Sequence, residues 1–271
     1  AHAGDIVAIC GIDQLRISDT LCDPLQVEAL PALTVDEPTV SMTFQVSNSP
    51  FAGQEGKYVT SRQIGDRLER ELIKNVALRI APGESADQFL VSGRGELHLS
   101  ILIETMRREG YEFSVAKPQV VVREIDGEQQ EPVERVVLDI EEQHQGEMMQ
   151  QMADRKGEML NMMPDGKGRV QMEFMVPTRG LIGLHARFIQ MTSGSGILYH
   201  SFDHFSPLKP GKIKFRQRGV MISNAVGKAT AFSLWNLQER GSMLIPPQTE
   251  VYEGMIVGIN SRDNDMVVNV I

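Results

Sequence analysis

Side chains capable of acid–base or metal chemistry occur at two places in the sequence. Glu96 and His98 stand two residues apart at the start of an expected helix, and His200 and His204 lie on either side of Asp203. Capping and packing at a helix start explain the first pair more simply than catalysis does. The second set lacks the further ligand pattern that a metal site needs. We therefore expect neither a catalytic pair nor a metal site.

A nucleotide site requires a phosphate-binding loop that opens a helix. No Gly is followed five residues later by Gly-Lys-Ser/Thr, and no Asn-Lys-x-Asp sequence occurs. The Gly-Lys pairs at 56–57, 166–167, 211–212 and 227–228 are typical of turns that end in a solvated lysine. The sequence therefore predicts that this chain holds no cofactor and is not itself an enzyme.

A basic run at residues 207–218 is the strongest functional feature. It holds five basic residues and no acidic one: Lys209, Lys212, Lys214, Arg216 and Arg218. Alternate residues of an extended strand share one face, so these cations can line a phosphate backbone. A solvated linker between domains explains the same composition, and the residues alone do not decide between the two.

Methionines gather in one stretch, where two interpretations compete. They are Met148, Met149, Met152, Met159, Met162 and Met163. A soft binding surface rich in Met is one interpretation, and an ordinary core is the other. Their helical and strand spacing favours the core.

Composition places the chain among soluble globular proteins. Its 271 residues predict about two domains, and its hydrophobic content of 41% and charged content of 23% are ordinary. No apolar run reaches membrane-spanning length, and no signal segment opens the chain. The net charge of −9 argues against a protein that coats nucleic acid, although a local basic patch can still bind RNA. Cys10 and Cys22 match no metal pattern, so we expect free thiols.

Hydrophobic periodicity predicts one β-α-β-β-α-β unit, present twice. The first copy comprises strand 40–46, helix 61–75, strand 76–81, strand 88–92, helix 95–109 and strand 111–116. The second comprises strand 133–141, helix 145–157, strand 158–163, strand 169–176, helix 179–192 and strand 197–203. Helix starts lie 34 residues apart in both copies, at 61 and 95 and at 145 and 179, which supports two ferredoxin-like domains. In the helix at 95–109, Leu97, Ile101, Leu102 and Met106 are expected to form one apolar stripe.

The flanking segments read as β structure. Strand-like residues 5–10 suggest the end of a β-barrel, and segments 219–223, 229–234, 250–260 and 266–271 predict a mostly β C-terminal part. Because both ends fall within strand-like sequence and residue 1 is not Met, we interpret the chain as a piece of a longer protein.

Several sequence motifs resemble those of translational GTPases. Residues 92–99 (S-G-R-G-E-L-H-L) resemble the third domain of elongation factor G, residues 4–9 (G-D-I-V-A-I) its β-barrel second domain, and residues 141–146 (E-E-Q-H-Q-G) its fifth. Residues 176–183 (V-P-T-R-G-L-I-G) depart from that factor and are similar to the BipA/TypA family of ribosome-associated GTPases. The segments at 219–224 (G-V-M-I-S-N) and 251–258 (V-Y-E-G-M-I-V-G) resemble that family's C-terminal domain.

The resemblance implies an α+β fold in four parts. These are the end of a β-barrel and a linker (1–34), a domain III-like ferredoxin-like domain (35–118), a domain V-like one (119–204) and a truncated family-specific C-terminal domain (205–271). It also implies a cytoplasmic, monomeric ribosome-binding portion that docks in the factor site and reaches rRNA, ribosomal proteins and A-site tRNA. The parent protein would serve stress adaptation and large-subunit assembly, with GTP and Mg held by an N-terminal domain that this chain lacks.

The candidate RNA contacts follow from these expectations. The primary candidates are Lys209, Lys212, Lys214, Arg216, Arg218 and Lys228. The secondary candidates for ribosome contact are Arg94, Arg107, Arg108, Arg179 and Arg187. Two alternatives stay open: a stand-alone metabolic enzyme on ferredoxin-like domains, which requires titratable groups converging in one cleft, and a regulatory module that binds protein.

Overall fold

The computed structural model describes residues 2–12, 15, 17–31, 38–211, 213 and 218–271. Chain contacts divide it into two compact units, Ala1–Gly211 and Lys212–Ile271. The described part of residues 2–31 contains no strand, and Ile6 and Leu25 in it are fully exposed or nearly so. The strand expected at residues 5–10 is therefore wrong, whereas the assignment of this segment to the end of a β-barrel stays a prediction. A strand forms only where a second strand pairs with it, and no pairing involves this segment.

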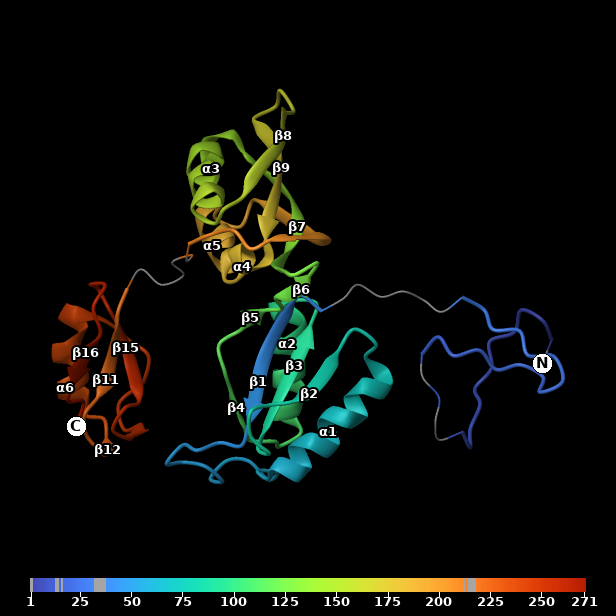
Figure 1. Cartoon of the computed structure of the whole chain (residues 1–271). Coiled ribbons are helices and arrows are strands. Elements are labelled where there is room, and N and C mark those ends of the chain that lie inside the picture. The colour runs from blue at the N-terminus through green and yellow to red at the C-terminus, as the bar shows by residue number, and fades with distance from the viewer. Residues whose placement is uncertain (1, 13–14, 16, 32–37, 212, 214–217) are drawn as a thin grey trace. The chain divides into compact units, whose positions relative to one another are not determined.

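The first repeat is an antiparallel sheet packed against two helices (Figure 1). Its elements are β1 (Val40–Gln45), α1 (Ser61–Lys74), β2 (Arg79–Pro82), β3 (Gln88–Gly93), α2 (Glu96–Arg108), β4 (Ser114–Val115) and β5 (Gln119–Val120). The strand order is β2-β3-β1-β4, with β5 also paired to β1. One core joins the sheet, through Phe44, to Ile64 and Leu68 of α1 and to Leu102 and Met106 of α2.

The apolar stripe of α2 differs from the expected one. Leu102 and Met106 are buried as predicted, but Leu99 completes the core stripe. Leu97 and Ile101 are instead exposed, at 74% and 57%. The helix therefore presents a second apolar face, away from its own sheet.

The second repeat has the same succession of elements. These are β6 (Arg123–Ile125), β7 (Glu128–Glu141), η1 (Glu142–His144), α3 (Gln145–Asp154), β8 (Glu158–Pro164), β9 (Arg169–Pro177), α4 (Thr178–Leu181), α5 (Leu184–Met191) and β10 (Ile197–Pro207). The strand order β8-β9-β7-β10 matches the order β2-β3-β1-β4 of the first repeat, and β6 pairs with β7. The expectation of α+β architecture is confirmed. The sheet also continues past the expected end at residue 204, because β10 pairs with β7 as far as Pro207.

The helix predicted over 179–192 is two helices. Gly183 separates α4 from α5 and has φ +68°, a left-handed conformation that interrupts a right-handed helix. The break leaves α4 as a separate turn of four residues, Thr178–Leu181.

The methionine prediction is wrong for four of its six residues. Met148 and Met152 on α3 are buried in the core of the second repeat. The exposed members are Met149, Met159, Met162 and Met163. Three of these lie on β8, which is the edge strand of its sheet as described and is exposed along its whole length.

The described part of the C-terminal unit holds a four-stranded sheet, a two-stranded sheet, one α-helix and one 3-10 helix. Its elements are β11 (Val220–Ser223), β12 (Gly227–Lys228), α6 (Ala231–Leu237), η2 (Gln238–Arg240), β13 (Gly241–Met243), β14 (Glu250–Val251), β15 (Ile256–Asn260) and β16 (Met266–Val268). The strand predicted over 229–234 is wrong: the side chain of Thr230 accepts a hydrogen bond from Ser233 N and starts α6. A short apolar run does not separate helix from strand by periodicity alone. Within the described ranges, no helix has the length and apolar character of a membrane span.

Candidate functional site

A buried ion pair holds the start of the basic segment against the second repeat. Arg179 on α4 donates two hydrogen bonds to Glu131 on β7, from Nε at 2.6 Å and from Nη2 at 3.1 Å. The same guanidinium donates to the carbonyl oxygens of Lys209 and Gly211. Glu131 is fully buried and accepts a third hydrogen bond from Lys209 N at 2.9 Å. We call this arrangement, Arg179 with Glu131, Lys209 and Gly211, the anchor.

The anchor changes the roles of two candidate RNA contacts. The side chain of Arg179 is only 15% exposed, so it serves the chain's own structure rather than a phosphate. Lys209 Nζ lies 2.7 Å from Glu158 Oε1 at the start of β8, and this hydrogen bond lowers the pKa of Glu158. Both cations are thus paired within the second repeat.

The remaining primary candidates lie after Gly211. Lys212, Lys214 and Arg216 fall outside the described residues. Arg218 is exposed, and the structure records no ion pair for it among the described residues. Lys228 on β12 lies 3.8 Å from Glu250, with both side chains about 60% exposed, so this pairing is weak and screened by solvent.

The secondary candidates on α2 and α5 lie on the surface. Arg107 and Arg108 both donate to Glu104, and these hydrogen bonds lower the pKa of that carboxyl to about 2. Arg187 lies 3.6 Å from Glu147. Because these pairs are exposed, each arginine can exchange its carboxylate for a phosphate at little cost.

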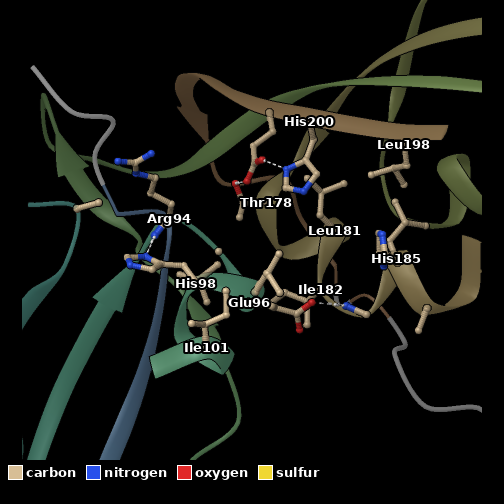
Figure 2. Close-up of a pocket in the computed structure, with 18 of the residues that line it drawn as sticks. Arg94, Glu96, His98, Ile101, Thr178, Leu181, Ile182, His185, Leu198 and His200 are labelled. Carbon is tan, nitrogen blue, oxygen red and sulfur yellow. Dashed lines mark hydrogen bonds and ion pairs between the residues drawn. The ribbon is translucent and has the colours of Figure 1, made fainter. Parts of the chain in front are cut away.

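A cavity of about 820 Å³ opens where α2 of the first repeat meets α4 and α5 of the second. Figure 2 shows Arg94 and His98 on one side, His185 and Leu198 on the other, and Thr178 and His200 between them. Ile101 contributes to its apolar wall, which explains why the second apolar face of α2 does not pack on its own sheet. The one direct hydrogen bond drawn across it joins Glu96 Oε2 to Gly183 N at 3.0 Å.

Four titratable side chains that line this cavity, those of Glu96, His98, Glu134 and His200, have hydrogen-bond partners within the protein. Glu134, with a side chain only 5% exposed, accepts from His200 Nδ1 at 2.6 Å and from Thr178 Oγ1 at 2.8 Å. This bond to Glu134 raises the pKa of His200. His98 is the opposite case, because burial, followed by the nearby charge of Arg94, lowers its pKa. Its Nδ1 accepts from Arg94 N at 3.2 Å, as a neutral ring does.

The structure places the His and Glu residues singled out from the sequence as follows. Glu96 and His98 bind different partners and do not form an acid–base pair. His200 bonds Glu134, whereas His204 bonds Asp203 at 2.7 Å, and the described residues contain no group of three or more potential metal ligands. Sequence reasoning missed Glu131 and Glu134, because nothing in a strand pattern indicates which buried carboxylate meets a distant cation.

Comparison with known proteins identifies the family. A model described as "Elongation factor G C-terminus" matches residues 128–214, and one described as "TypA/BipA C-terminal domain" matches residues 218–271. The chain belongs to the TypA/BipA family. The resemblance noted from the motifs is therefore confirmed, and the TypA/BipA model lies on the C-terminal unit.

Individual relatives agree over the full length of this chain. It is 60% identical over 269 residues to the "Large ribosomal subunit assembly factor BipA" of Salmonella typhimurium and 52% identical over 270 residues to that of Bacillus subtilis. These alignments cover 99% and 100% of this chain but 44% of each relative, so the chain spans less than half of their length. A solved structure from Thermus thermophilus matches 70% of this chain and 44% of its own at 13% identity, with a TM-score of 0.42.

Proposed function

We propose that this chain is the ribosome-binding portion of a translational GTPase and acts in the cytoplasm during large-subunit assembly. The observation that carries the proposal is its 60% identity to a protein named as a large ribosomal subunit assembly factor. The match to the C-terminal region of elongation factor G supports binding in the ribosomal factor site. The shared strand order supports two ferredoxin-like domains that present rigid surfaces to rRNA and ribosomal proteins.

In this proposal the chain docks and orients, while other parts of the parent protein bind GTP and Mg. The C-terminal unit would reach A-site tRNA, and the parent would contribute to stress adaptation. The basic residues after the anchor, namely Lys212, Lys214, Arg216, Arg218 and Lys228, would contact RNA phosphates. Arg94, Arg107, Arg108 and Arg187 would add weaker contacts from the two repeats.

Sedimentation with purified large ribosomal subunits over a series of salt concentrations tests this proposal. The variant K212Q/K214Q/R216Q should bind more weakly, with a salt slope lower by up to about 0.9 for each lost phosphate contact on duplex-like RNA. The matched control R62Q/K74Q/K167Q removes the same charge from exposed positions in the two repeats and should keep the parent slope. Equal slopes for the two variants would show that the basic segment is a linker.

The cavity supports a second candidate function, because it gathers titratable groups in one place as an enzyme would. We favour docking, since Glu134, Glu96 and His98 already have hydrogen-bond partners within the protein. An E134Q variant should therefore bind large subunits as the parent does. A catalytic cavity would instead reveal itself by turnover that this substitution abolishes, in a screen of small metabolites.

A further inference from the structure

Two aromatic side chains stand exposed on α6 of the C-terminal unit. Phe232 is 73% and Trp235 67% exposed, although burial of such rings is one of the strongest contributions to stability. Residues three apart share a helix face, so the two rings are neighbours. Leu234 is buried and Leu237 packs against the core of this unit, on the opposite side of the helix. Leu234 and Leu237 thus provide the face of α6 that packs on the core, and the two aromatic rings take no part in that packing.

The helix that carries these rings is firmly held. Thr230 caps it through Ser233 N at 3.2 Å, Ser233 Oγ donates to Ile271 O at 2.9 Å, and Thr230 N donates to Val270 O at 2.8 Å. The rings therefore project from a fixed surface. A fixed aromatic surface loses little conformational entropy when it binds a partner.

The surroundings of the rings favour a nucleic acid over an apolar protein partner. The other exposed residues on α6 and η2 are small or polar: Ala231, Asn236, Gln238, Glu239 and Arg240. The unit holds seven basic and five acidic residues, a net charge of +2 against −9 for the whole chain. Among the described residues, Arg218, Arg240 and Arg262 form no ion pair. Exposed aromatic rings in a domain that also carries exposed cations are the combination that binds single-stranded nucleic acid.

We propose that Phe232 and Trp235 form a stacking surface for unpaired nucleobases of RNA. Base stacking on aromatic side chains needs no particular sequence, because every base offers a flat π-face. Asn236, exposed on the same helix face, can hydrogen-bond the edge of a stacked base. This inference deepens the proposed function, since it names unpaired RNA as the element that the C-terminal unit recognises.

Trp235 is the chain's only tryptophan, so its fluorescence reports directly on this surface. We expect a single-stranded 12-mer of adenylate to quench it on titration, and a blunt RNA duplex of equal length to quench it much less. F232A should weaken the single-strand affinity about ten-fold, with no change in salt slope because no charge is removed. W235F, followed by fluorescence anisotropy of labelled RNA, should retain most of the affinity. L244A removes another exposed apolar side chain of the unit and is the matched control.

The outcomes separate this inference from the proposed function. Equal affinity of F232A, L244A and the parent for single-stranded RNA would overturn the inference, whether or not the chain sediments with ribosomal subunits. Loss of subunit binding in F232A without any RNA quenching would also overturn it, because the rings would then contact protein. If single strands bind through Trp235 but subunits do not sediment with the chain, the stacking surface stands and the proposed function falls.

Discussion

The second helices of the two repeats occupy equivalent places and differ in one residue's backbone. In the first repeat α2 runs unbroken through its 13 residues from Glu96. In the second, Gly183 divides the equivalent helix into α4 and α5. The division directs Arg179 toward Glu131 and exposes the Gly183 N–H to Glu96. The segment around this break therefore makes hydrogen bonds to the second repeat, to the first repeat and to the start of the basic segment.

The ion pairs of the two repeats differ in how far their carboxylates are exposed to solvent. In the first, Arg67 bonds Glu71 and Glu109, whose side chains are 22% and 40% exposed. In the second, Glu131 has no exposed surface. A partly exposed carboxylate can turn to water when its partner is lost, whereas a buried one cannot. The comparison predicts unequal consequences for losing each arginine.

The largest effect is expected for R179M. It leaves the Glu131 carboxylate buried and unpaired, which should destabilise the second repeat by about 3–5 kcal/mol. R67M in the first repeat should cost about 2 kcal/mol, the value of hydrogen bonds to a charged group. Hydrogen exchange of β7 and β9, compared with β1 and β3, measures each repeat separately.

The double variant R179M/E131M controls for the buried charge. Removing both partners of a buried ion pair is often neutral or stabilising, so the exchange rates of β7 should return close to those of the parent. Equal protection of β7 in R179M and the parent would show that the anchor is not needed for the fold of this repeat.

A smaller effect is expected at the helix break. G183A should destabilise the second repeat by about 1 kcal/mol, because alanine resists φ +68° even though no atom lies near the added methyl group. G146A, inside α3 and also free of close neighbours, should stabilise the same repeat by about 0.5–1 kcal/mol. Urea unfolding of both variants measures whether the free energy of unfolding falls in G183A and rises in G146A. A stabilised G183A would mean that α4 and α5 can join into one helix.

The smallest effects concern the two histidines of the cavity and differ in sign. The raised pKa of His200 stabilises the fold below its unfolded value, about 6.5, and this stabilisation disappears as pH rises through the folded value. The lowered pKa of His98 acts oppositely, and its contribution disappears as pH falls below about 6.5. H200Q should therefore lose more stability at pH 5.5 than at pH 8.5, and H98Q the reverse. Parallel pH profiles for the two variants would contradict this assignment.

Much of the repeat architecture could be predicted from the sequence, because hydrophobic periodicity and equal helix spacing both act locally. The wrong predictions concern residues whose surroundings depend on contacts with distant parts of the chain. Arg179 reads as a surface cation until Glu131, 48 residues away, is placed beside it. Leu97 and Ile101 look like core because their spacing is helical, yet they line a cavity formed with the second repeat. The helix α6 is the exception, since its apolar run is short enough to suit a strand and only the local cap at Thr230 indicates a helix.

The second repeat carries methionines of two kinds, exposed ones on the edge strand β8 and buried ones on α3, which should differ in their rate of oxidation. Methionine thioethers exposed to solvent, those of Met159, Met162 and Met163, should convert to sulfoxides with dilute peroxide while the fold remains intact. Met148 and Met152, which have no exposed surface, should resist until the repeat opens. The ratio of the two classes of sulfoxide in a peptide mass spectrum therefore reports the intact fraction of this repeat, without a label, in any mixture that contains the chain.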